Sequence, residues 1–89
     1  MNKIYIFTSQ TCPYCDKIKV HFPEIWNMFK DRAKFYLINV TDEETRGYVE
    51  KFRVTRIPLF VIQSDENSYI TIQTSNKDYL IDKLNRLLN

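Results

Sequence analysis

Two cysteines separated by two residues, Cys12 and Cys15, are the side chains in this chain best suited to covalent chemistry. Thiols three positions apart at the start of a helix lie on one side of its first turn, within reach of a disulfide. A sulfur at that place also faces unpaired backbone N–H groups and the positive end of the helix dipole, and both stabilise a thiolate. The spacing therefore predicts a redox pair, in which Cys12 attacks a disulfide and Cys15 resolves the adduct.

The residues around the two cysteines are typical of an exposed turn that opens a helix. Pro13 suits the first helical position, where a missing N–H costs nothing. Thr11 belongs to the polar turn before the motif. Tyr14 is expected either to lie exposed against a substrate or to be an inert surface aromatic. The backbone N–H groups of Tyr14 and Cys15 are expected to donate to the sulfur of Cys12.

A cysteine pair at this spacing can also serve purposes apart from redox exchange. A zinc site needs four ligands, and the other soft candidate is His21, more than one turn past Cys15. The pair could also be buried core cysteines, a structural disulfide, or ligands of a metal or iron–sulfur cluster shared by two subunits. A redox-silent adaptor is a further alternative. The strand–turn–helix setting favours redox chemistry with no metal.

The segment Thr55–Arg56–Ile57–Pro58 is the second candidate element of the site. A proline that opens a central strand cannot donate to the sheet, so it requires a reason. A cis bond between Ile57 and Pro58 supplies one, because it turns the N–H and C=O of Ile57 outward, beside Cys12. An extended peptide or glutathione could then pair with Ile57 as an added strand. An ordinary trans proline at a strand start is the alternative.

The remaining elements follow from hydrophobic patterning, and they alternate as β-α-β-α-β-β-α. A four-stranded mixed sheet with helices on both faces, of the α/β class, is therefore predicted. Pro23 should kink or split the first helix near Phe22, and Ser75 or Asn76 should cap the last one. The expected strands are 3–7, 34–40, 59–62 and 69–74, and the expected helices begin at residue 13, after a cap at 41–42, and after 75–76.

Composition limits the range of functions. The 89 residues predict one domain, 1–89, and the 13 basic against 11 acidic residues give a net charge of +2, too small to indicate nucleic acid or a membrane surface. A single glycine, Gly47, excludes a glycine-rich phosphate loop. No apolar run is long enough to span a bilayer or to form a signal peptide, so a cytoplasmic protein is expected.

The chain resembles the thioredoxin-fold oxidoreductases over essentially its whole length, and more narrowly the glutaredoxins. Cys12–Pro13–Tyr14–Cys15 is identical to the dithiol glutaredoxin motif, and the strand Ile4–Phe7 precedes it directly. Thioredoxins carry a Trp just before the first cysteine and a buried Asp on the preceding strand, where this chain has Thr11 and Ile6.

Further segments look more like a thioredoxin. Residues 40–54 do so, and Arg56–Ile57–Pro58 stands where glutaredoxins usually have Thr-Val-Pro. Thr74–Ser75 stands where glutaredoxins carry a Gly-Gly pair near the γ-glutamyl end of glutathione, and Asp78 lies where their helix-start Asp falls. On this resemblance, Arg56, Ile57, Pro58, Ser75 and Asp78 are the candidate substrate- or glutathione-binding residues.

The resemblance implies a monomeric thiol–disulfide oxidoreductase with no tightly bound cofactor. Its expected substrates are protein or glutathione mixed disulfides, with ribonucleotide reductase among the expected targets. Glutathione is the expected reductant, and a flavoenzyme of the thioredoxin reductase type is the alternative.

Overall fold

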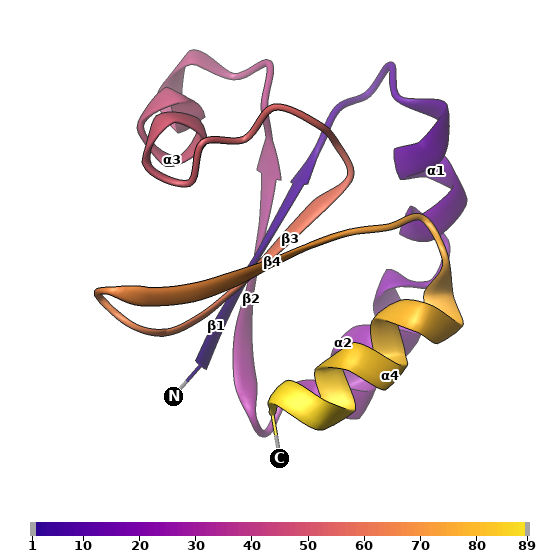
Figure 1. Ribbon diagram of the computed structural model, residues 1–89. Helices are drawn as coiled ribbons and strands as arrows, with labels where there is room; N and C mark the ends of the chain where they lie inside the picture. The colour runs from indigo at the N-terminus through magenta and orange to yellow at the C-terminus, as the bar shows by residue number, and fades with distance from the viewer. Residues whose placement is uncertain (1, 89) are drawn as a thin grey trace.

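The computed structural model describes residues 2–88 and contains one four-stranded sheet (Figure 1). Its strands are β1 (Asn2–Thr8), β2 (Ala33–Asn39), β3 (Leu59–Asp65) and β4 (Ser68–Gln73), in the spatial order β2-β1-β3-β4. β2 runs parallel to β1, whereas β3 is antiparallel to both β1 and β4. The mixed sheet predicted from the sequence is confirmed, with the apolar strand β3 in the interior and β4 at an edge.

Helices cover both faces of this sheet. α1 (Pro13–Lys19), α2 (Phe22–Phe29) and α4 (Lys77–Leu87) lie on one face, and the short α3 (Arg46–Lys51) lies on the other (Figure 1). Side chains of β1 alternate between two cores, one on each face of the sheet. Ile4 and Ile6 belong to the core beneath α1, α2 and α4, whereas Tyr5 and Phe7 belong to the core beneath α3. A strand segment buried on both faces must be apolar at successive positions, which explains the run Ile4–Phe7.

Proline splits the first predicted helix into two. α1 ends at Lys19 and α2 begins at Phe22, with Pro23 in the first turn of the second helix, where its missing N–H is tolerated. The split was predicted from Pro23 and is confirmed. Its consequence is that two helices supply one core, with Ile18 from α1 and Ile25 and Phe29 from α2.

The helix expected after residues 41–42 is shorter than predicted. A 3-10 turn at Glu43–Thr45 precedes α3, and neither Thr41 nor Asp42 makes a side-chain cap to it. Thr41 instead donates its hydroxyl to the Asn39 side chain at 2.7 Å. The apolar residues of this segment face the sheet, since Phe52 is buried and Val49 packs against the same core.

The last helix begins after a side-chain cap. Asn76 accepts a hydrogen bond from the backbone N–H of Tyr79 at 2.9 Å, so Asn76 rather than Ser75 is the capping residue. Leu80 and Leu84 of α4 are fully buried against the sheet. No helix within residues 2–88 has the length and apolar character needed to cross a membrane.

Candidate redox site

Cys12 is the N-cap of α1, directly beyond the carboxyl end of β1. Its sulfur accepts a hydrogen bond from the backbone N–H of Cys15 at 3.1 Å. Its own carbonyl accepts from the N–H of Asp16, also at 3.1 Å, which closes the first helical turn. Of the two N–H groups predicted to reach this sulfur, Cys15 makes the bond and Tyr14 does not. The cap places a partly exposed sulfur at the positive end of the helix.

Cys15 lies behind Cys12 and is fully buried. Burial, and then the hydrogen bond with the Cys12 side chain, raise the pKa of the Cys15 thiol from 9.0 to about 11. Both cysteines are free thiols in this structure. The two sulfurs therefore have different surroundings, one open to an incoming disulfide and the other protected and held protonated at neutral pH.

A positive charge lies close to the buried cysteine. The ammonium group of Lys19, one turn after Cys15, donates to the Ser9 carbonyl at 3.3 Å and lies 3.9 Å from the Asp16 carboxylate. This charge opposes the effect of burial on the Cys15 thiol, because burial raises its pKa and the ammonium group lowers it. Ser9 is itself buried and orders the turn before the motif, since its hydroxyl accepts from the N–H of Thr11 at 3.2 Å.

The bond between Ile57 and Pro58 is cis, as predicted, and it lies beside Cys12. The Sγ atom of Cys12 is 3.9 Å from the carbonyl oxygen of Ile57, across 45 positions of sequence. Pro58 is buried and Ile57 is half-buried, and the two residues directly precede β3. The structure thus brings the cysteine motif and the backbone before Pro58 together, so a chain bonded to Cys12 would lie along Ile57.

The family model for thioredoxin matches residues 2–86. The chain belongs to the thioredoxin family. Its members are thiol–disulfide oxidoreductases that act on protein disulfides, so the enzyme class predicted from the cysteine pair is confirmed. No curated protein matches the sequence significantly.

Solved thioredoxins share the fold of this family member at low sequence identity. Deadhead, the germline-specific thioredoxin of Drosophila melanogaster, has a TM-score of 0.83 and 17% identity over 97% of this chain and 80% of its own. The thioredoxin of Fasciola hepatica has a TM-score of 0.82 and 21% identity over 96% and 79%. That of Trypanosoma brucei brucei has a TM-score of 0.82 and 23% identity over 98% and 74%.

The family match covers residues 2–86, which include the cysteine motif, and the solved thioredoxins share the fold. The broad prediction of a thioredoxin-fold oxidoreductase is therefore confirmed. The narrower prediction of a glutaredoxin is not, and thioredoxin fits this family member better.

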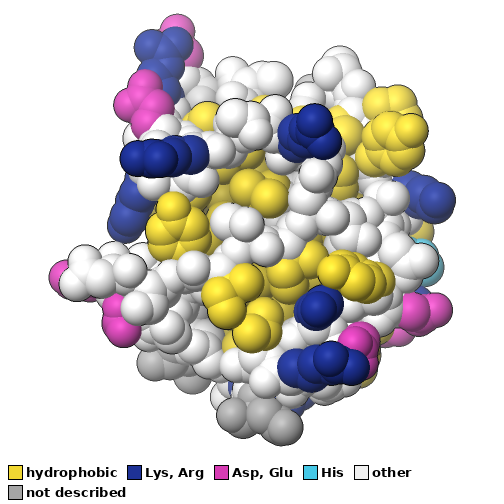
Figure 2. Space-filling view, in the orientation of Figure 1, with side chains coloured by type: hydrophobic (Ala, Val, Ile, Leu, Met, Phe, Trp, Pro, Cys, Tyr) yellow, Lys and Arg dark blue, Asp and Glu magenta, His cyan; other side chains and the backbone are white. Residues whose placement is uncertain are grey.

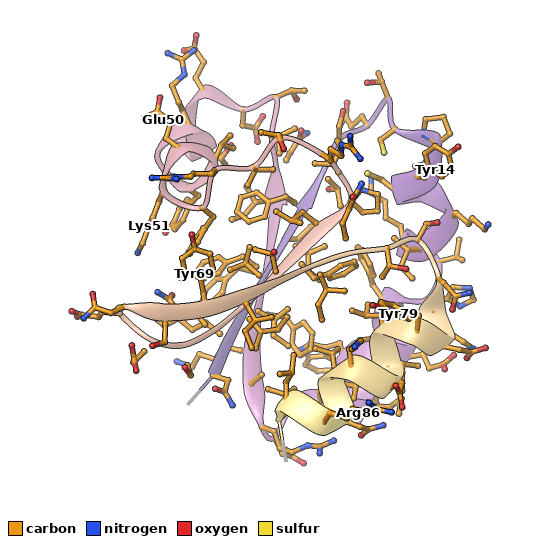
Figure 3. All side chains as sticks on the ribbon, viewed as in Figure 1. Tyr14, Glu50, Lys51, Tyr69, Tyr79 and Arg86 are labelled. Atoms are coloured by element: carbon orange, nitrogen blue, oxygen red, sulfur yellow. The ribbon has the colours of Figure 1, made fainter. Side chains whose placement is uncertain are left out.

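The remaining predicted site residues differ in whether they adjoin the cysteine motif or the segment Ile57–Pro58. Pro13 and Tyr14 lie exposed in the first turn of α1, where Tyr14 points outward (Figure 3). Arg56 is exposed and adjoins Ile57. Ser75 is half-buried before α4 and Asp78 is exposed in its first turn; within residues 2–88, neither forms a hydrogen bond with Cys12 or Ile57.

Two contributors to the site were underestimated from the sequence. Lys17 and Lys19 look alike as basic residues of an amphipathic helix, yet Lys17 is exposed and Lys19 reaches Ser9. The signal that separates them is spacing, because a residue four positions after Cys15 lies above it on the same helix face. Ser9, one of several polar residues before the motif in the sequence, is buried and holds that turn through its hydroxyl.

Proposed function

We propose that this protein reduces protein disulfides by a dithiol cycle, with Cys12 as the nucleophile and Cys15 as the resolving thiol. The observation that carries the proposal is the pairing of a part-exposed sulfur, bonded to the helix-start N–H of Cys15, with a fully buried thiol at the same turn. The nearby backbone of Ile57 offers a hydrogen-bonding edge for the substrate chain.

The cycle consists of two exchanges at sulfur. The Cys12 thiolate attacks one sulfur of a substrate disulfide, a bond forms between Cys12 and that sulfur, and the other substrate sulfur leaves as a thiolate that takes up a proton. Cys15 then loses its proton and attacks the Cys12 sulfur, which releases the second substrate thiol. The substrate gains two electrons and two protons, and the protein becomes the Cys12–Cys15 disulfide.

We propose a flavoprotein of the thioredoxin reductase type as the electron donor. The family match and the thioredoxin-like segment that ends in Arg56–Ile57–Pro58 support this choice. Glutathione is the second candidate, and the Cys12–Pro13–Tyr14–Cys15 motif favours it. A reducing compartment such as the cytoplasm suits either donor, since the cysteines must return to thiols after each cycle.

Cysteine variants test the two roles. Cys12→Ser should abolish reduction of a protein disulfide such as insulin, whereas Cys15→Ser should stop after the first exchange and accumulate a mixed disulfide visible by mass spectrometry. Multiple turnovers by the Cys12→Ser variant would refute the assignment. Re-reduction by NADPH with thioredoxin reductase, compared with glutathione plus glutathione reductase, decides the donor, and faster turnover with glutathione would overturn our choice.

A further inference from the structure

A hollow of about 410 Å³ lies between the segment that follows α3 and the face of edge strand β4. Its wall on one side carries Arg53, Thr55 and Arg56, and on the other side Thr71 and Gln73. Rings and methyl groups of three further residues complete it: Phe52, Leu59 and Tyr69. Figure 3 shows Tyr69 on β4 beneath α3, on the same side of the sheet as Lys51.

The charges of this hollow are all of one sign. Arg53 and Arg56 line it, no Asp or Glu does, and within residues 2–88 neither arginine has an ion-pair partner. The acidic side chains visible in Figure 2 gather toward the edges of that view, and the middle of the face has none. An arginine pair without a carboxylate favours an anionic ligand, because the guanidinium fork binds carboxylates through two parallel hydrogen bonds.

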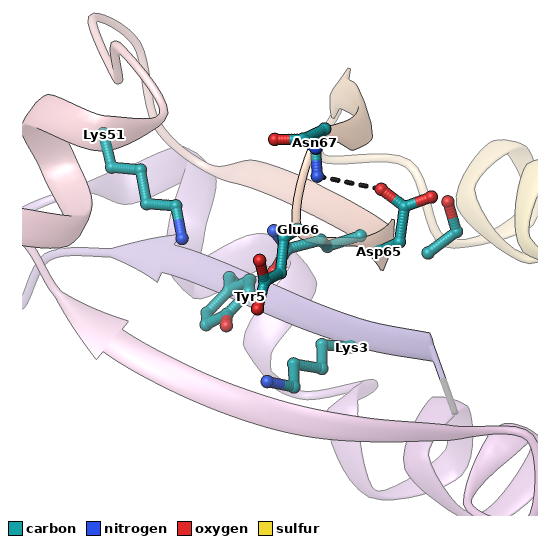
Figure 4. A pocket seen from close by; sticks show the side chains of 8 residues that line it. Lys3, Tyr5, Lys51, Asp65, Glu66 and Asn67 are labelled. Atoms are coloured by element: carbon teal, nitrogen blue, oxygen red, sulfur yellow. Dashed lines mark hydrogen bonds between the residues drawn. The ribbon is translucent and has the colours of Figure 1, made fainter.

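A second hollow, of about 490 Å³, provides a contrast. It is lined by Lys3 and Lys51 but also by Asp65 and Glu66, so its charges are mixed (Figure 4). One carboxylate there is already engaged, since Asp65 accepts from the backbone N–H of Asn67 at 2.8 Å. Of these two hollows, the one beside β4 has positive charges alone, and these favour an anionic ligand.

The backbone at Arg53 has an unusual conformation. Arg53 has a φ of 53°, the left-handed conformation in which glycine is preferred. The position ends α3, because Val54 donates to the Val49 carbonyl and Arg53 donates to the Glu50 carbonyl, as in helix ends that usually carry glycine.

The hollow adjoins the redox site. Arg56 directly precedes Ile57, whose carbonyl oxygen is 3.9 Å from the Cys12 sulfur. On the other side, Gln73 of β4 is the register partner of Leu59, which directly follows Pro58. A polypeptide bonded to Cys12 and running along Ile57 therefore reaches the hollow within a few residues of its own cysteine.

We propose that this hollow binds an acidic side chain of the substrate, so that the enzyme prefers protein disulfides with Asp or Glu close to the cysteine. The inference rests on the proposed function, since it assumes that Cys12 forms the bond to the substrate. Arg53 and Arg56 hold the carboxylate, and the hydroxyls and amide of Thr55, Thr71 and Gln73 surround it with further donors.

Two matched peptides test the preference. Each carries one cysteine in a mixed disulfide with thionitrobenzoate, flanked on both sides by Glu in one peptide and by Gln in the other. Release of the yellow thiol by the pre-reduced full-length protein gives a second-order rate constant that needs no reductase. We expect the Glu peptide to react about tenfold faster, with the ratio falling toward one in Arg53→Gly, in Arg56→Gln and in 0.5 M salt.

Arg86→Gln is the matched control, because Arg86 is an exposed arginine on α4 paired with Asp82, far from α3 in Figure 3. It should keep the wild-type ratio. A ratio near one in the wild-type protein, or a ratio unchanged in both hollow variants, would overturn the inference and leave the proposed function standing. Reaction with neither peptide would instead count against the proposed function.

The carboxylate bound in the hollow has two possible sources, an acidic protein substrate and glutathione. Oxidised glutathione distinguishes between them. Its rate constant is measured with the same variants, and Arg53→Gln serves as a second replacement that removes the charge but keeps a side chain of similar length. We expect the arginine variants to lose rate mainly with the Glu peptide. A tenfold loss confined to oxidised glutathione would assign the hollow to glutathione and contradict acidic protein substrates.

Discussion

At the scale of single residues, the two cysteines differ because one is buried and the other caps a helix. A thiol with a pKa of about 11 is ionised in only about one molecule in ten thousand at pH 7. The resolving exchange therefore depends on whatever stabilises the Cys15 thiolate at the moment of attack. A nearby cation, the Lys19 ammonium group, lowers the pKa of the Cys15 thiol and so favours that thiolate.

The buried thiol should show its raised pKa in its reactivity. In the Cys12→Ser variant, alkylation of Cys15 by iodoacetamide should keep accelerating above pH 9, because burial, the largest cause of the shift, remains. The measurement is the alkylation rate from pH 7 to 11, with the unfolded variant as reference. A folded-state curve that levels off at or below the reference would contradict the burial argument.

Lys19 should act on the resolving step. Replacing it by Met removes a charge that lowers the pKa of the Cys15 thiol, so that pKa rises and fewer molecules are ionised at neutral pH. We expect release of the second substrate thiol to slow by about threefold to tenfold at pH 7, with its pH–rate profile displaced to higher pH. The first exchange at Cys12 provides the internal comparison.

Matched variants separate charge from structure at this position. Lys19→Arg should restore most of the resolving rate, and Lys17→Met should resemble the wild-type protein, since Lys17 is exposed on the same helix. Identical pH–rate profiles for Lys19→Met and the wild-type protein would show that the ammonium group contacts Ser9 for structural reasons alone.

At the scale of elements, the end of α3 should be strained by its own side chain. Arg53 adopts a left-handed backbone that costs an L-residue about 1–2 kcal/mol and glycine much less. Arg53→Gly should therefore raise the free energy of unfolding by up to about 1 kcal/mol, since the entropy that glycine gains in the unfolded chain offsets part of the relief. Urea unfolding measures it, with Arg53→Ala, which keeps the strain, as the control. A gain by both variants would remove strain as the cause.

Much of this arrangement could be predicted from sequence because local patterns control it. The apolar runs of β1 and β3, the split at Pro23 and the cysteine-capped helix each depend on a few neighbouring residues, and the structure confirms them. The cis bond at Pro58 was also predicted, from the conflict between a proline and a central strand.

The rest depends on contacts between separate segments, which local patterns do not encode. A 3-10 turn replaces the predicted helical turn before α3, and there the Thr45 hydroxyl donates across the loop to the Asn39 carbonyl at 2.8 Å. Two further features also involve separate segments. One is the hydrogen bond from Lys19 to Ser9, and the other is the hollow lined by Arg53 and Gln73. Placing them required the assembled fold.

At the scale of the whole molecule, the sheet lies between two cores that share its central strands. Phe52 is buried in the core on the α3 face, where its ring lies 5.1 Å from that of Tyr5 and 5.0 Å from that of Tyr69. Trp26, the only tryptophan in the sequence, lies on α2 over the opposite face. Both cores share β1 and β3, so loss of packing on one face should weaken the other.

Phe52→Ala tests this coupling. The cavity should lower the free energy of unfolding by about 3–5 kcal/mol, and the milder Phe52→Leu should lower it by less. Trp26 is half exposed and borders the far core, where it lines a hollow with Ile4 and Ile6. Its fluorescence therefore reports that face and far-UV circular dichroism reports the whole fold, so one cooperative unit predicts equal shifts of both urea midpoints. If the fluorescence midpoint stayed at its wild-type value while the dichroism midpoint fell, the two faces would unfold separately, and the site that spans β1 and β3 could not be treated as one rigid support.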